Sequence, residues 1–428
     1  MNEHYDALET RDPAQREAML MAVLPAQVRT AQATAGFAPD LADIDAAEIG
    51  TRTALARLPV TRKHQLLERQ QAARDGTAGD PFGGMSAIGW RGIGAARIAR
   101  RVFQSPGPIY EPEGHAADYW RLARALFAAG IRAGDLVHNS FSYHLTPAGS
   151  MMETGAQALG CVVFPGGVGN TELQLQALRD LGADAYCGTP SFLRILLDKA
   201  DAEGVALPRL KHALVSGEAF PPSLRDAFAN SGVDAFQAYA TADVGCIAYE
   251  TAARQGLVLA ENLIVEIVRP GTDDLVPEPE SGTAPEVGEV VVTVLNPDYP
   301  LLRFGTGDLS ALLPGTCPTG RTNHRIRGWL GRADQTAKVR GMFVHPSQVA
   351  QVLKRHPEVI RARLVIEGEM ANDRMTLHAE CAVAPAGLQA ALAQSLRDIT
   401  KLRAEVACHA PGTLANDGRV IEDQRSLA

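Results

Sequence analysis

Cysteine, basic charge and long apolar runs are all scarce in this chain. Its six cysteines stand singly and no CxxC pair occurs, so we expect reduced, mostly buried thiols. No apolar run is long enough to cross a bilayer. The N-terminal sequence MNEHYDALETRDPAQREAML is charged and lacks the apolar core of a signal peptide. These absences predict a cytoplasmic protein without a membrane segment.

The charge balance argues against a nucleic-acid-binding protein. The formal net charge is −8 and the pI is about 5.8, whereas nucleic-acid binders carry a basic patch. With 46% hydrophobic and 21% charged residues, the composition is that of an ordinary globular protein. A chain of 428 residues is too long for one core, so we expect two or three domains.

The central part of the chain alternates short apolar runs with amphipathic segments. The predicted helices are 117–130, 147–159, 171–181, 190–202 and 221–230, and the strands after them are 135–141, 161–165, 183–187, 212–216 and 235–239. This pattern predicts a mostly parallel α/β sheet with right-handed crossovers. Ligands bind such sheets at the carboxyl ends of the strands.

Two smaller regions are predicted after the sheet. Residues 246–299 are typical of a β-rich subdomain, and residues 335–428 of a small α+β domain. The elements expected in the small domain are helix 346–356, strands 361–367 and 374–383, helix 385–401 and strand 403–408.

The stretch from Leu301 to Pro346 carries the most informative residues. The sequence RFGTGDL ends in two glycines and Asp308, and GRAD follows after a loop. A carboxylate on a glycine turn at a strand end suits the two hydroxyls of a ribose. A surface turn with a capping aspartate is the alternative for TGD alone.

These segments, in this order, resemble the adenylate-forming superfamily, and within it the phenylacetate–CoA ligase group. By that resemblance Asp308 holds the ribose of ATP, Arg332 makes a phosphate-side contact and Asp334 is a hinge. The implied fold is a large N-terminal α/β domain with mostly parallel sheets and a β-rich subdomain, spanning 1–333. It is hinged to a small α+β domain, spanning 334–428.

Further strings strengthen the resemblance. The sequence GGVGNTE…LQAL…LGAD…TPSFL is similar to the same group, and LPVTRK is another such string. The loop residues Phe141, Tyr143, His144, Gly167 and Gly169 are candidates for the acyl-substrate site. A core position for Phe141, and a capping role for the Asn170 or Thr171 side chain, are the structural alternatives.

The nucleotide site is implied by two loops. The family has Gly-Ala-Glu where Ser216, Gly217 and Glu218 stand, and Tyr-Gly-x-Thr-Glu where Tyr239-Ala240-Thr241-Ala242-Asp243 stands. By the resemblance, Tyr239 flanks the adenine and Ala240 lies beside it. Ala242 replaces a threonine that touches the α-phosphate. Asp243 replaces a magnesium-binding glutamate and still offers hard oxygen ligands.

Three further regions depart from the family pattern. Tyr110 and Glu111 stand where the phosphate loop has a glycine and a lysine, and a carboxylate there would repel a triphosphate. The lysine expected beside Gly418 is missing, and Arg419 is a doubtful substitute. Cys317 lacks the partners of a possible metal knot, because Thr251, Val258 and Thr319 occupy the other positions; we expect no zinc site, and a surface position for His324.

Two functions remain open at this point. The first is a ligase that joins an aryl or arylacetyl carboxylate to coenzyme A through an acyl-adenylate, using ATP and magnesium. The second is a degenerate relative that binds AMP or acyl-CoA without activating acids, as Glu111 and Tyr110 suggest. The expected partners are the carboxylate and coenzyme A, with no nucleic acid or membrane, and a homodimer is one possible assembly.

Overall fold

The computed structural model describes residues 3–75, 80–90, 98–105, 108–279, 282–335, 337–339, 342–368, 373–382, 385–415 and 419–425. The chain divides into two compact units. The first comprises Met1–Thr306 with Ala311–Trp329, and the second comprises Gly307–Ser310 with Leu330–Ala428. The predicted boundary between residues 333 and 334 lies within the second unit. No described helix is both long and apolar enough to cross a membrane.

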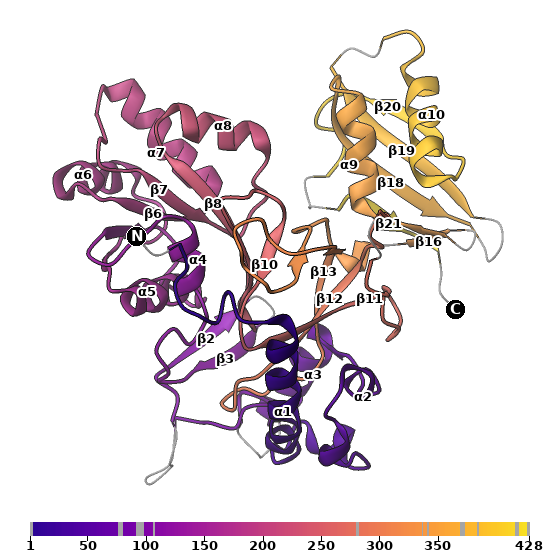
Figure 1. Cartoon of the computed structure of the whole chain (residues 1–428). Coiled ribbons are helices and arrows are strands. Elements are labelled where there is room, and N and C mark those ends of the chain that lie inside the picture. The colour runs from indigo at the N-terminus through magenta and orange to yellow at the C-terminus, as the bar shows by residue number, and fades with distance from the viewer. Residues whose placement is uncertain are drawn as a thin grey trace. The chain divides into compact units, whose positions relative to one another are not determined.

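The N-terminal segment begins with a helix and ends in a hairpin. Its elements are α1 (Pro13–Gln32), η1 (Ala38–Leu41), η2 (Ala46–Glu48), α2 (Arg52–Leu55), β1 (Thr61–Arg62), α3 (Lys63–Asp75), β2 (Arg101–Ser105) and β3 (Ile109–Glu113). The three helices and the hairpin β2–β3 are labelled in Figure 1. Asp12 caps α1 by accepting a hydrogen bond from the Gln15 amide, and Pro13 fills the first position, where no N–H is needed.

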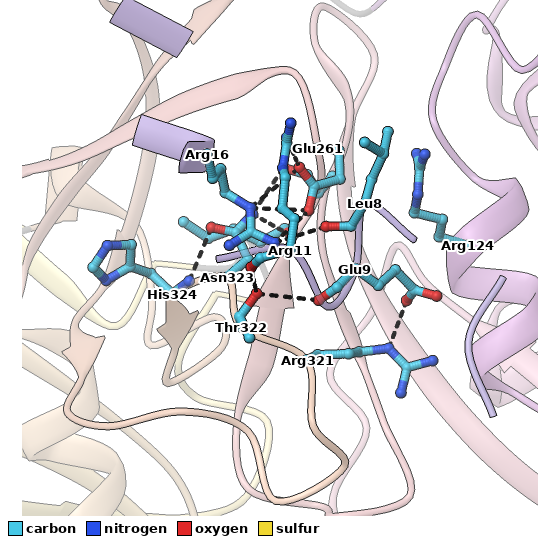
Figure 2. Close-up of polar contacts among 12 residues, drawn as sticks. Leu8, Glu9, Arg11, Arg16, Arg124, Glu261, Arg321, Thr322, Asn323 and His324 are labelled. Atoms are coloured by element: carbon cyan, nitrogen blue, oxygen red, sulfur yellow. Dashed lines mark hydrogen bonds and ion pairs between the residues drawn. The ribbon is translucent and has the colours of Figure 1, made fainter. Parts of the chain in front are cut away.

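Buried ion pairs attach the residues before α1 to the rest of the first unit (Figure 2). Glu9 accepts hydrogen bonds from Arg321 Nε at 2.6 Å and from the Tyr249 hydroxyl at 2.7 Å. Arg16 and Arg11 both pair with Glu261. Buried charges persist only when they are paired, so these contacts fix the N-terminal segment in place.

A nine-stranded sheet dominates the first unit, in the order β14-β15-β10-β9-β8-β7-β6-β4-β5. Its strands are β4 (Leu136–Asn139), β5 (Val162–Pro165), β6 (Ala185–Gly188), β7 (His212–Val215), β8 (Asp234–Thr241), β9 (Gly245–Glu250), β10 (Leu257–Leu259), β14 (Leu312–Leu313) and β15 (Arg325–Ile326). The pairs from β5 to β8 are parallel and the remaining pairs are antiparallel. The predicted α/β fold with its mostly parallel strands is therefore confirmed for this region.

The crossover helices agree with the prediction except for the first. They are α4 (Ala123–Ala128), α5 (Ala148–Leu159), α6 (Thr171–Leu181), α7 (Pro190–Glu203) and α8 (Pro222–Asn230). The helix predicted over 117–130 is wrong before residue 123, because Asp118 and Arg121 adopt positive φ angles of 49° and 65°. The Asp118 carboxylate instead accepts hydrogen bonds from the amides of Leu122 and Ala123.

The β-rich subdomain contains a second sheet in the order β1-β13-β12-β11. Its long strands are β11 (Leu263–Val268), β12 (Gly288–Val294) and β13 (Phe304–Ser310). The start of β13 is anchored by Arg303, which is fully buried and donates from Nε to Glu266 at 3.0 Å. This pair holds the RFGTGDL segment in register with the sheet.

The second unit folds around its own core. It contains η3 (Ala333–Gln335), β16 (Ala337–Val339), β17 (Met342–Val344), α9 (Pro346–Arg355), β18 (Val359–Glu367), β19 (Arg374–Cys381), α10 (Leu388–Thr400), β20 (Glu405–His409) and β21 (Ile421–Asp423). The order of its four-stranded sheet is β20-β19-β18-β21. Apolar residues of α9, α10 and the sheet form one cluster, as expected of an α+β domain.

Candidate active site

The loops that follow β4, β5, β7 and β8 leave the sheet at the carboxyl ends of these strands. This is the edge at which open α/β sheets bind ligands. Four segments predicted to form the site lie there: 140–144, 166–170, 216–218 and 242–244. The topology therefore brings the predicted substrate and nucleotide loops to one edge.

A buried glutamine organises the loop after β5. Gln174 on α6 donates from Nε2 to the carbonyls of Gly167 and Gly169, both at 2.7 Å. Its Oε1 accepts from Ser140 Oγ at 2.6 Å and lies 2.8 Å from His138 Nε2. No local sequence pattern indicates this role, because the partners are separated by five to 36 residues.

The two glycines of this loop adopt φ angles of 68° and 74°, which disfavour other residues. Asn170 also has a left-handed backbone, and its side chain makes no capping hydrogen bond to α6. The alternative in which Asn170 caps the helix through its side chain is therefore wrong. The side chain of Gln174, in the first turn of α6, supports the loop instead.

The loop after β4 does not present all its aromatic residues to solvent. Phe141 is buried and belongs to the main hydrophobic cluster, in agreement with its core alternative. The Tyr143 hydroxyl accepts a hydrogen bond from Asn139 Nδ2 at 2.8 Å, and His144 is exposed. Burial raises the pKa of Tyr143, so its phenol stays neutral.

The loop after β7 holds one inward and two outward residues. Ser216 is buried, and its hydroxyl donates to the Ala238 carbonyl on β8 at 2.8 Å. Gly217, at a φ of 82°, and Glu218 are exposed. Glu218 accepts a hydrogen bond from the Ser191 amide at 3.2 Å. Backbone groups and Glu218, rather than the Ser216 hydroxyl, are thus presented at the edge.

Tyr239 is fixed between the two sheets of the first unit. Its hydroxyl donates to Thr306 Oγ1 on β13 at 3.2 Å, and Thr306 in turn donates to the Val290 carbonyl. The residue is only 9% exposed. The pairing of β8 with β9 shifts register between Tyr239 and Ala240, which is half-buried. Tyr239 is therefore rigid and offers only a small ring area to a purine.

Asp243 lies in the turn between β8 and β9 and is paired with a residue that sequence inspection missed. Lys63 Nζ lies 2.9 Å from Asp243 Oδ2. The Asp243 side chain is 1% exposed and the Lys63 side chain 35%. In the sequence Lys63 stands out only as part of the string LPVTRK, and the 180 residues between the partners hide the pair from any local pattern.

Glu111 faces the same corner from the hairpin β2–β3. It is fully buried, and its Oε1 accepts a hydrogen bond from Ser105 Oγ at 2.6 Å. No described donor reaches Glu111 Oε2 or Asp243 Oδ1. Burial, together with the Asp243 charge, raises the pKa of Glu111 to about 9. Glu111 is therefore neutral at pH 7, and its proton can bridge the two carboxyl groups.

The prediction that Glu111 repels a triphosphate assumes a charged side chain in an open loop, and this assumption is wrong. Residue 111 lies on a strand inside the protein and carries no charge at neutral pH, rather than lying in an open loop. The Ser105 hydroxyl is also directed inward to Glu111. Pro106 and Gly107, at the tip of the predicted phosphate loop, lie outside the described residues.

Tyr110 occupies the opposite side of strand β3. Its backbone N–H and C=O are both bound by the Gln70 side chain of α3, at 2.8 and 2.9 Å. Its hydroxyl accepts from Gln104 at 2.9 Å. Tyr110, which stands where the family has a loop glycine, is therefore a fixed residue of strand β3. Helix α3, which begins at Lys63, is tied to the hairpin that carries Glu111.

Asp308 and Arg332 come together in the second unit. The two residues form an isolated antiparallel bridge, and Arg332 Nη1 donates to Asp308 Oδ1 at 3.1 Å. Gly307 has a φ of 74°, and a Cβ there would lie 2.6 Å from Arg332 Nη2. The expected strand-end turn is wrong, because Gly307 and Asp308 lie within β13. The glycine is needed for the close approach of the guanidinium.

The remaining predicted residues are placed only in part. The backbone of Asp334 forms the middle of the 3-10 turn η3, and Arg419 is exposed. Gly418 lies outside the described residues. The proposed roles of Asp334 as a hinge and of Arg419 as a substitute cation therefore stay predictions.

The residues around Cys317 do converge. Cys317 Sγ lies 3.3 Å from Thr251 Oγ1 and 3.1 Å from Thr319 Oγ1. Burial would raise the pKa of Cys317, but hydrogen bonds from both threonines outweigh it and lower the pKa. Among the described residues, no group of three or more His, Cys, Asp or Glu side chains could hold a metal. His324 is exposed, as expected.

The chain is similar in sequence to phenylacetate–coenzyme A ligases. It is 31% identical to the enzyme of Aromatoleum evansii over 274 residues, which are 61% of this chain and 60% of that protein. It is 32% identical to the Thermus thermophilus enzyme over 268 residues, 60% of this chain and 59% of that protein. The matched part thus spans about three fifths of these relatives. No protein-family model matches the chain.

The fold extends the similarity over the whole chain. An open conformation of 2-hydroxyisobutyryl-CoA ligase, in complex with 2-HIB-AMP and CoA, superposes with a TM-score of 0.81. It is 23% identical, and the match covers 99% of this chain and 97% of that one. The postadenylation state of the same ligase gives a TM-score of 0.73. The chain therefore has the fold of the adenylate-forming CoA ligases and resembles the phenylacetate–CoA ligase group in sequence.

Proposed function

We propose that the protein is an AMP-forming acid–CoA ligase that acts on an aryl or arylacetyl carboxylate. In the first step the carboxylate attacks the α-phosphate of ATP, giving an acyl-adenylate and pyrophosphate. In the second step the thiol of coenzyme A attacks the acyl carbon and releases AMP. The sequence similarity to phenylacetate–CoA ligases carries this proposal, and the predicted substrate and nucleotide loops at the carboxyl edge of the sheet agree with it.

The proposed roles follow the site geometry. Tyr239, held by Thr306, would flank the adenine, and the exposed Gly217 and Glu218 lie on the neighbouring loop. Asp308 would bind the ribose hydroxyls in exchange for its contact with Arg332. The loop that Gln174 holds would line the acyl pocket, beside Tyr143.

Magnesium fits one atom of this corner. Asp243 Oδ2 is occupied by Lys63, while Oδ1 is buried and faces the protonated Glu111 carboxyl group, whose proton the ion would displace. Magnesium typically binds one or two protein carboxylates together with substrate phosphates, so a single oxygen is sufficient. When bound, the ion would neutralise charge on the phosphates. Asp243 would hold it, and Lys63 would keep the carboxylate oriented.

The second candidate, a degenerate relative, now rests on fewer observations. Its main argument was the charge of Glu111, which the hairpin buries in neutral form. Ala242 in place of a threonine, and the absence of a lysine beside Gly418, still favour it. Both changes remove a donor to the phosphate or the carboxylate, so the assay must measure turnover rather than binding alone.

The test is pyrophosphate release with ATP, magnesium, coenzyme A and a panel of aryl and arylacetyl acids. We expect release that depends on the acid, and a thioester product of matching mass. Binding of AMP with no pyrophosphate from any acid would overturn the ligase proposal and favour the degenerate relative. An Asp198→Ala variant is the control, because Asp198 pairs only with Arg194 on the surface of α7 among the described contacts.

Two further expectations belong to this proposal. If Asp334 is a hinge, then Asp334→Pro should slow thioester formation from a preformed acyl-adenylate more than it slows pyrophosphate release. Equal slowing of both steps would argue against a hinge there. The homodimer and the cytoplasmic location stay predictions, and light scattering tests the first.

A further inference from the structure

A phosphate-binding site in this fold needs a cation. Within the first unit, the positions expected to carry that cation do not do so. Residue 111 is a buried glutamic acid. Arg332 belongs to the second unit, where it pairs with Asp308. Lys63 is a cation at the carboxyl edge of the first unit's sheet, since its partner Asp243 lies in the turn after β8.

The backbone around Lys63 is held at both ends. Strand β1 pairs with β13 through Thr61 and Phe304, and Lys63 follows it as the first residue of α3. Gln70 ties the same helix to the hairpin β2–β3. A cation in the first turn of a helix opposes the helix dipole, at a cost of about 0.3–1 kcal/mol. The position of this lysine is therefore not explained by helix stability.

The Lys63 side chain is oriented by its ion pair and is partly exposed. One of its three N–H donors is used by Asp243 Oδ2 at 2.9 Å, and no other hydrogen bond of Lys63 is seen in the described part of the chain. The lysine side chain is 35% exposed and its partner 1% exposed. The buried Asp243 carboxylate thus orients the ammonium group of Lys63, while part of the lysine side chain is exposed to solvent.

The position of Lys63 also suits the phosphate of a bound adenine nucleotide. Asp243 follows Tyr239 by four residues in the segment that turns from β8 into β9. A purine against Tyr239 would place its 5′ substituent within reach of this turn. A lysine ammonium is a flexible point charge that suits a phosphate oxygen.

We propose that Lys63 is the residue that binds the phosphate attached to adenosine in this protein, held in place by Asp243. This inference rests on the proposed function, because it assumes that the adenosine lies at Tyr239. It assigns to α3 the cation that the family resemblance places in the phosphate loop. It makes Lys63 a binding residue for the nucleotide phosphate, and not merely a counter-ion of a buried aspartate.

The experiment is calorimetry of the full chain with AMP, adenosine and phenylacetate in turn. A Lys63→Met change alone leaves Asp243 unpaired, so the double variant Lys63→Met/Asp243→Asn is the main one. It removes both charges of the pair and keeps the buried corner neutral. Lys63→Arg keeps the charge in a different shape. Lys199→Met is the control, because Lys199 pairs only with surface glutamates of α6 and α7 among the described residues.

We expect the double variant to bind AMP at least tenfold more weakly, while its affinities for adenosine and phenylacetate change less than about twofold. Lys63→Arg should recover part of the AMP affinity, and Lys199→Met should change none of the three. Equal weakening of AMP and adenosine would show a structural role and overturn the inference. It would also be overturned by a loss confined to phenylacetate, or by an unmodified protein that binds AMP no better than adenosine.

This readout separates the inference from the proposed ligase activity. Pyrophosphate release tests the ligase, and the ratio of AMP to adenosine affinity tests Lys63. A chain that forms no adenylate can still show the ratio. An active ligase whose AMP affinity is unchanged in the double variant would refute the role of Lys63 and leave the proposed function standing.

Discussion

Two aspartates, each beside a cation, mark two predicted parts of the nucleotide site, and they differ in their surroundings. Asp243 is 1% exposed and pairs with Lys63, which is 35% exposed. Asp308 is 12% exposed and pairs with Arg332, which is 39% exposed. The first pair also faces a second carboxyl group, Glu111, whereas the residues of the second pair also form an isolated backbone bridge. The same pairing therefore compensates a buried charge in one place and joins two more exposed side chains in the other.

The largest expected effect comes from removing the cation of each pair. Lys63→Met leaves a buried carboxylate without its counter-ion, and we expect the free energy of unfolding to fall by about 2–3 kcal/mol. Arg332→Met removes a more exposed partner and should cost less than about 1 kcal/mol. Urea denaturation of both variants measures the difference. Equal losses would mean that burial does not distinguish the pairs.

The next effect concerns ligand binding. Asp308→Ala should lose about 1.5–3 kcal/mol of AMP binding, the scale of hydrogen bonds to a charged group. Since the ribose is common to both ligands, adenosine should weaken by the same factor, unlike in the Lys63 variants. Calorimetry with the two ligands decides this point. Unchanged AMP affinity would remove the ribose assignment.

A smaller effect should appear in the pH dependence of stability. Because the pKa of Glu111 is raised in the folded state, its contribution is complete below the unfolded pKa and is lost as the pH rises toward about 9. Glu111→Gln keeps an acceptor for Ser105 and a donor toward Asp243 without titrating. We expect it to add about 1–3 kcal/mol at pH 8 relative to pH 5. Parallel melting-temperature curves for both proteins would contradict the buried-acid assignment.

The smallest expected effect tests the close approach at Gly307. Gly307→Ala combines a positive φ with a contact of 2.6 Å to Arg332 Nη2. Gly232→Ala is a matched control, since its φ is 80° and a Cβ there meets nothing within 4 Å. Both should lose about 1 kcal/mol from backbone strain, and Gly307→Ala a further ~0.5–1 kcal/mol. Identical losses by thermal unfolding would show that Arg332 moves away freely.

The sequence was sufficient for the fold because the signals there are local. Alternation of apolar strands with helices such as 171–181 and 190–202 predicted the parallel sheet and its ligand-binding edge. The helix predicted from residue 117 failed because a side chain, Asp118, satisfies the backbone amides and permits a different local path. Helix propensity alone does not predict such a side-chain-to-backbone contact.

The site was predicted less completely, because its polar contacts join distant residues. Sequence motifs indicate Asp243, Asp308 and Arg332, but they do not show which residues pair with the two aspartates. Lys63 lies 180 residues from Asp243, and Glu111 was assumed to be an exposed, charged loop residue. Burial decides whether a carboxyl group is charged, and burial is a property of the folded chain.

The hydrogen bonds from Gln174 to the loop after β5 have a consequence for the proposed recognition of the acid. Two left-handed glycines, Gly167 and Gly169, would leave a free loop with many conformations, and a ligand that ordered it would lose affinity to that entropy. Gln174 fixes both glycine carbonyls without any ligand. In the proposed acyl site this loop would therefore be a preorganised pocket wall, and discrimination between acids should depend on shape and show little slow adjustment after binding.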